Sequence, residues 1–144
     1  MTQTVEQAVK EAKLYTDNKA YVLLCFHPHA ITVAASVIAE LSEPFSALIV
    51  DKDEVTLVIP ADSVGAFASR LRDYRVSDSQ FSLITFDVAL DPNLTGFMAR
   101  ISQKLAEANV IIMPFAAYTR DHILVPVEHF EKAWAALTKL VSGK

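Results

Sequence analysis

The strongest constraint on the fold of this chain is a repeat in its apolar pattern. Pro60 and Pro126 lie 66 positions apart, and each follows a short apolar segment that reads as a strand. With that offset, Thr56–Ile59 lies over His122–Val125. The helical stripes that follow also align, so that Val64, Ala68 and Leu71 lie over Phe130, Trp134 and Leu137. The pattern indicates two copies of one β-α-β-β-α unit.

Each half of the chain supplies the five elements of that unit. In the first half they are a strand over 21–26, a helix over 31–41, a hairpin of strands over 45–50 and 55–59, and a helix after Pro60. In the second half they are a strand over 81–88, a helix over 94–108, strands over 110–115 and 122–125, and a helix over 128–141. Ahead of both, residues 4–15 read as a further helix, because Thr4 and Gln7 fit a capping box.

This element order predicts an α+β fold. A right-handed crossover followed by a hairpin gives an antiparallel sheet with the helices packed on one face, which is the ferredoxin-like arrangement. We therefore expect two tandem ferredoxin-like units. The predicted division is an N-terminal helix extension over 1–19, a first unit over 20–79 and a second unit over 80–144.

The composition narrows the classes of function. Although 52% of the 144 residues are hydrophobic, the longest apolar runs are only strand-length, so no membrane span is expected. The formal net charge is −4 with no basic block, which disfavours nucleic-acid binding. One cysteine and no signal-peptide pattern favour the cytoplasm. The apolar excess must be buried in a core or in an interface with a second copy of the chain; the second possibility would make a homodimer.

The second half resembles ACT domains, the small-molecule regulatory modules of amino-acid metabolism. The resemblance spans residues 81–141 and is most specific in the segment DHILVP; residues 20–73 resemble the family only in pattern. Within that group the chain is similar to short tandem-ACT proteins related to the regulatory end of aspartate kinases, and to the animal cytosolic arginine sensors. The first unit then reads as a degenerate ACT-like unit and the second as an ACT domain.

The resemblance implies a ligand sensor without catalytic residues or cofactor. Its ligand, an amino acid, is expected at an interface between units, near the turn that joins the first strand to the first helix. In this sequence the matching turn consists of Asn93, Leu94, Thr95, Gly96 and Phe97. A helix N-terminus there suits a carboxylate, and Gly96 permits close approach of a ligand.

Asp121, the first residue of DHILVP, is the candidate for the opposite end of the ligand. Its carboxylate suits an ammonium or guanidinium group, so an amino acid would be held at both ends. The first unit lacks these features, because its equivalent turn, residues 27–31, has no glycine and Val55 stands at the position of Asp121. If two competent units are needed, the second must come from another chain.

Two other readings stay open. One is a protein-interaction or scaffold module whose ligand site has decayed. The other is a small metal-dependent enzyme that uses His27 and His29, although metal sites normally need three or four ligands and no enzyme motif is present. Cys25 lies in an apolar run and reads as a buried small residue, and Tyr118 reads mostly as core, with a pocket wall or a dimer interface as the alternatives.

Overall fold

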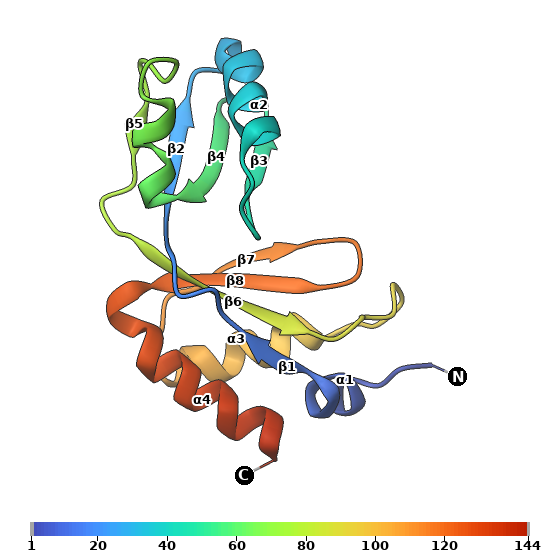
Figure 1. The fold of residues 1–144 in the computed structure, drawn as a ribbon. Coiled ribbons are helices and arrows are strands. Elements are labelled where there is room, and N and C mark those ends of the chain that lie inside the picture. Colours follow the sequence, from blue (N-terminus) through green and yellow to red (C-terminus); the bar gives the residue numbers. More distant parts are fainter. Residues whose placement is uncertain (1, 144) are drawn as a thin grey trace. The chain divides into compact units, whose positions relative to one another are not determined.

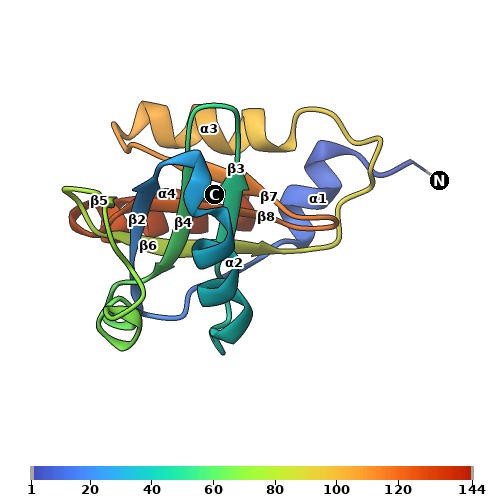
Figure 2. The same ribbon diagram turned by 90° about the horizontal axis from the view of Figure 1, so that it is seen from above.

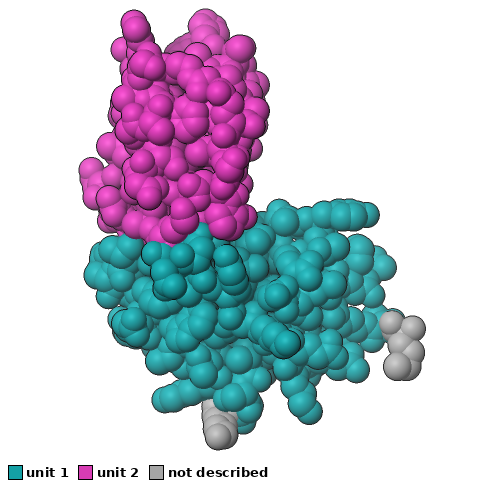
Figure 3. All heavy atoms as spheres, in the orientation of Figure 1, with its two compact units in different colours: residues 1–18, 82–144 teal, residues 19–81 magenta. Residues whose placement is uncertain are grey.

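The computed structural model describes residues 2–143 and divides the chain into two compact units. Unit 1 comprises residues 1–18 and 82–144, and unit 2 comprises residues 19–81 (Figure 3). Residues 1–18, set apart in the sequence as an extension, therefore group with the second half of the chain. In sequence terms, unit 2 is an insertion within unit 1.

Unit 1 contains a four-stranded sheet and three helices (Figure 1). Its strand order is β7-β8-β6-β1, in which β7 pairs antiparallel with β8 and β1 pairs antiparallel with β6. The elements are, in chain order, α1 (Val5–Glu11), β1 (Lys13–Tyr15), β6 (Phe81–Asp87), α3 (Phe97–Glu107), β7 (Met113–Ala116), β8 (Asp121–Pro126), the 3₁₀ turn Val127–His129 and α4 (Phe130–Ser142).

The N-terminal helix is shorter than its pattern predicts. It begins with the expected capping box, since the Thr4 hydroxyl accepts from the Gln7 N–H at 3.1 Å and the Gln7 side chain accepts from the Thr4 N–H at 2.9 Å. The helix ends at Glu11, because Ala12 is extended and residues 13–15 form β1. Leu14 lies opposite Phe86 of β6 and packs on the core, so the expected helix over 4–15 is wrong in its last turn.

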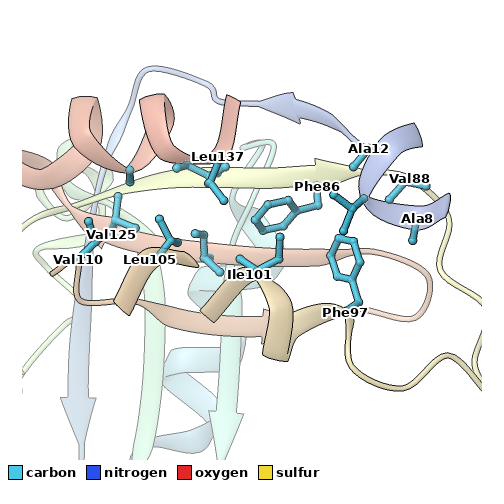
Figure 4. Packing of buried hydrophobic residues seen from close by; sticks show 14 residues of the cluster. Ala8, Ala12, Phe86, Val88, Phe97, Ile101, Leu105, Val110, Val125 and Leu137 are labelled. Carbon is cyan, nitrogen blue, oxygen red and sulfur yellow. The ribbon is translucent and has the colours of Figure 1, made fainter. Parts of the chain in front are cut away.

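The core of unit 1 lies between one face of its sheet and the helices (Figure 4). Alternate strand residues point into it, as the period of two in a half-buried sheet requires. Helices α3 and α4 contribute residues at helical spacing, and α1 contributes Ala8 and Val9. The buried set includes Ile84, Phe86, Ile101, Leu105, Ile123, Val125, Ala133 and Leu137.

Unit 2 has the same kind of sheet, with strand order β3-β4-β2-β5. Helix α2 packs on β3 and β4 (Figure 2) and contributes Ala34 and Val37 to a second apolar core. The elements are β2 (Ala20–Phe26), the 3₁₀ turn Pro28–Ala30, α2 (Ile31–Glu40), β3 (Ala47–Val50), β4 (Val55–Pro60), two 3₁₀ turns (Ala61–Ser63 and Gly65–Phe67) and β5 (Arg75–Val76).

The end of unit 2 differs from the secondary structure expected from the sequence. The segment after Pro60, expected as a helix, forms two 3₁₀ turns instead, although Leu71 of its predicted stripe is buried in the core. The strand β5, only two residues long, pairs antiparallel with β2 and was not predicted. The predicted α+β class, with antiparallel sheets and helices packed on them, is confirmed.

Candidate functional site

A cavity of about 320 Å³ lies in unit 1, at one end of the helix α3. Its wall combines the loop that joins β6 to α3, the first turn of α3 and the tip of the β7–β8 hairpin. The lining residues are Leu90, Asp91, Pro92, Leu94, Gly96, Phe97, Met98, Ala99, Ala117, Tyr118, Thr119 and Asp121. Two segments of the chain, residues 90–99 and residues 117–121, thus meet around one space.

The first turn of α3 presents its backbone to this cavity. Gly96 is the N-cap residue, with a left-handed φ of 98°, and as a glycine it has no side chain that could cap the helix. A glycine tolerates that conformation, whereas a residue with a Cβ would be strained. Because the first N–H groups of a helix have no partner within the helix, this end offers donors and partial positive charge to an anion.

The loop before α3 is fixed by short hydrogen bonds. Within the loop, the Asp91 carboxylate accepts from the Asn93 N–H at 2.9 Å, and the Asp91 carbonyl accepts from the Leu94 N–H at 2.9 Å. The Leu90 N–H donates to the Thr119 carbonyl at 2.7 Å, which ties the loop to the hairpin tip. The two sides of the cavity are therefore connected through the backbone.

Asp121 carries the second chemical feature of the site. It opens β8, lines the cavity and is half-buried. Burial raises the pKa of its carboxyl group above 3.8, and the neighbouring His122 partly opposes that rise. A carboxylate that has lost water is the kind of group that gains most from a cationic partner.

The charged residues that line the cavity are both acidic. They are Asp91 and Asp121, and no lysine or arginine is among the lining residues. Arg120, next to Asp121 in the chain, donates from Nε to the Asp87 carboxylate at 2.8 Å. The side-chain charge of the cavity is therefore negative, while the backbone end of α3 is its positive pole.

Four of the six residues named from the sequence meet at the cavity. Leu94, Gly96, Phe97 and Asp121 line it, whereas Asn93 and Thr95 are exposed and are not among its lining residues. Phe97 also belongs to the core, where its ring meets the ring of Phe86 edge-on at 5.6 Å. Whether any of the six binds a ligand stays a prediction.

The hairpin tip is the part of the site that the sequence missed. Tyr118, read mostly as core, is 94% exposed and lies at the cavity wall, so the reading as core is wrong, whereas both alternatives, a pocket wall and a dimer interface, agree with its exposure. Asp91 also lines the cavity, although it is not among the site residues named from the sequence. A turn of Asp91, Pro92 and Asn93 opposite a polar hairpin tip was the available signal, but only the long-range bond between Leu90 and Thr119 shows that they meet.

The two histidines of the metal-dependent enzyme hypothesis, and Cys25, lie in unit 2. The rings of His27 and His29 are 4.4 Å apart, and His27 Nδ1 accepts from the His29 N–H at 3.2 Å, which caps a 3₁₀ turn. Within residues 2–143 no three His, Cys, Asp or Glu side chains gather where they could hold a metal ion. Cys25 is partly exposed rather than buried, and its Sγ lies between the Glu54 carboxylate at 3.6 Å and Arg75 Nη2 at 3.7 Å.

Part of the chain matches a known domain family. Residues 76–139 match the family model of the ACT domain. No curated protein matches the chain significantly. Among the helices of residues 2–143, none is long and apolar enough to cross a membrane.

Solved structures share the fold over most of the chain. A Vibrio cholerae protein of unknown function, described as a possible transport protein, is 26% identical with a TM-score of 0.74, and the match covers 96% of each chain. The regulatory subunit of Thermus thermophilus aspartate kinase, in its ligand-free form, is 14% identical with a TM-score of 0.68 over 92% of this chain and 98% of that chain. Clostridium acetobutylicum aspartate kinase is 14% identical with a TM-score of 0.71 over 91% of this chain and 34% of that enzyme.

Proposed function

We propose that this chain is a non-catalytic regulatory protein that binds an amino acid in the cavity of unit 1. One observation carries the proposal: a single cavity combines the uncapped N-terminus of α3 with the half-buried carboxylate of Asp121. The helix end suits the carboxylate of an amino acid, and Asp121 suits its ammonium group. The match of residues 76–139 to the ACT domain supports the same class.

The charge of the lining favours an amino acid with a cationic side chain. With Asp91 and Asp121 as the charged lining residues, a ligand with one carboxylate and two cationic groups leaves each carboxylate with a partner. Tyr118 adds an aromatic ring at the rim, against which a guanidinium or an alkyl chain can pack. We therefore expect L-arginine or L-lysine to bind more tightly than L-glutamate.

Thermal unfolding with single amino acids tests the proposal. At 100 times its dissociation constant a ligand adds about 2.7 kcal/mol to the free energy of unfolding, which raises Tm by several degrees. L-arginine and L-lysine are compared with L-citrulline and L-norleucine, which resemble them in shape but lack the side-chain cation. Calorimetric titration then gives Kd for each compound that shifts Tm.

The variant Asp121→Asn distinguishes an effect on ligand binding from an effect on the stability of the fold. We expect this variant to lose the shift caused by L-arginine or L-lysine while its unliganded Tm at pH 7 stays equal or rises slightly, because the raised pKa means that the fold disfavours the ionised carboxylate. Glu107→Gln, an exposed acid at the end of α3, is the matched control and should keep the shift. An unchanged shift in Asp121→Asn would show that the site is misplaced.

Two features of the proposed protein depend on other measurements. We propose that the two units are copies of one ACT-type unit, a relation that the resemblance to the animal cytosolic arginine sensors implies. We also propose that the chain acts in the cytoplasm as a homodimer, in which the ligand sites of the two copies come together. Sedimentation with and without L-arginine measures the mass of the assembly. If no amino acid shifts Tm and a stable dimer forms, the interaction module with a decayed site is the better description.

A further inference from the structure

The segment Gln3–Glu11 contacts the loop that joins β6 to α3. The Gln3 carboxamide bridges two backbone groups of that loop: its Oε1 accepts from the Asp91 N–H at 2.8 Å, and its Nε2 donates to the Ala89 carbonyl at 3.2 Å. These groups flank Leu90, which lines the cavity and is held on its other side by Thr119. Gln3 is half-buried; its bond to the Asp91 N–H is partly shielded from water, whereas its bond to the Ala89 carbonyl is exposed.

The same segment also contacts the start of α3. A Cβ added at Gly96 would lie 3.6 Å from Cγ2 of Val5, so Val5 stands directly beside the N-cap of α3. One turn further along α3, Nη1 of Arg100 lies 3.6 Å from Oε1 of Glu6, the residue that follows Val5. Farther along α1, Ala8 and Ala12 lie near Phe97 and Val88 in the core (Figure 4).

We propose that residues 3–11 position the ligand cavity, with Gln3 as the positioning residue for its loop. The effect on binding rests on the proposed function, because that names the ligand. The effect of Gln3 on the position of the loop does not depend on any ligand. Gln3 sets the loop at Asp91, and Val5 lies against the start of α3 at Gly96, so both ends of the stretch that joins β6 to α3 are supported by one short segment of the chain. Since binding free energies are linked, occupancy of the cavity in turn stabilises the docked α1.

Hydrogen exchange in the unliganded protein tests the structural half. In Gln3→Ala, the Asp91 amide must exchange faster because its acceptor is gone. The proposal expects faster exchange to spread to the amides of Leu94 and Leu90, whose bonds to Asp91 and Thr119 depend on the loop position. Acceleration confined to Asp91 would overturn it, whatever the cavity binds.

Binding of L-arginine, with L-lysine in parallel, tests the functional half. We expect Gln3→Ala to raise Kd about fivefold or more while Tm changes little, since the loop and not the core loses its support. Gln3→Glu keeps the acceptor for Asp91 and loses the donor to Ala89, so its Kd should lie between those of Gln3→Ala and the wild type. Gln103→Ala, an exposed glutamine of α3, is the matched control.

Reciprocal protection completes the test. In the wild type, L-arginine at saturation should slow exchange of the Ala8 and Ala12 amides, which bond to Thr4 and Ala8 within and after α1. Unchanged exchange in α1 together with unchanged Kd in Gln3→Ala would overturn the proposal. If the wild type binds no amino acid, the proposed function fails, and the exchange pattern of unliganded Gln3→Ala still decides the positioning role.

Discussion

The hydroxyl of Thr85 lies 2.8 Å from Nδ1 of His122, a hydrogen bond that joins β6 to β8 in unit 1. Thr85 is buried and His122 is half-buried, so the bond is partly shielded from water. Burial lowers the pKa of the His122 imidazole below 6.5; the adjacent Asp121 partly opposes this effect, and Arg120 adds to it. The folded chain therefore prefers a neutral imidazole at this position.

This preference predicts a loss of stability in mild acid. Because the folded-state pKa is depressed, the contribution of His122 is complete above pH 6.5 and is lost as the pH falls through the lowered value. Urea unfolding of the wild type and of His122→Asn at pH 7.5 and pH 5.5 measures it. Asparagine keeps a polar atom near Thr85 and does not titrate, so the variant should lose less stability between the two pH values. An equal loss in both proteins would contradict the assignment.

Gly96→Ala should destabilise unit 1 by about 1–2 kcal/mol, because the φ of 98° is strained for a residue with a Cβ. The space itself is sufficient, since the added Cβ would meet only Val5 at ordinary contact distance. Gly65→Ala is the matched control: its φ is not positive and nothing lies within 4 Å, so the unfolding free energy should stay level or rise. Equal losses in the two variants would exclude backbone strain as the cause.

Thr4→Ala should cost about 1 kcal/mol of unfolding free energy, because it removes the acceptor for the Gln7 N–H at the start of α1. The matched change is Thr138→Ala in α4, where the hydroxyl donates to the Trp134 carbonyl inside the helix. There alanine is the better helix former, so stability should not fall. Chemical unfolding of both variants compares the two threonines directly, and a larger loss at Thr138 would argue against the cap.

The Cys25 thiol should react with a disulfide reagent in the native protein. The side chain is partly exposed beside a cavity of about 320 Å³, so unfolding is not required for access. Release of the reagent's chromophore under native conditions is expected to reach one equivalent, since the chain has one cysteine. Reaction that appears only in denaturant would restore the reading of Cys25 as a buried core residue.

Elements with long and regular patterns could be predicted from the sequence. The stripe of Phe97, Ile101 and Leu105 defines α3, and the apolar run 21–26 lies within β2. The last turn expected for the N-terminal helix became β1, because Leu14 gains a place in the core opposite Phe86 that no local pattern reveals. The strand β5 is too short for any periodicity and exists through its pairing with β2.

Only part of the candidate site could be predicted from the sequence, again because long-range contacts bring the other residues to it. Gly96 and Asp121 belong to segments whose local chemistry suggests a role, a helix N-cap and the first residue of a strand. Asp91 and Tyr118 become part of the cavity through the bond between Leu90 and Thr119, which spans the whole of α3 and β7. Gln3 and Asp91 are 88 positions apart in the sequence, with all of unit 2 between them, and no sequence pattern predicts a contact over that separation.

The insertion of residues 19–81 between β1 and β6 also sets an order of assembly during synthesis. Unit 2 is continuous in sequence, so its contacts can form as soon as its own residues have left the ribosome. Helix α1 and strand β1 emerge earlier but find their partners only after β6, α3 and α4 have been made. The segment that contacts the cavity loop is thus translated before unit 2 but finds its partners only after unit 2 has been made.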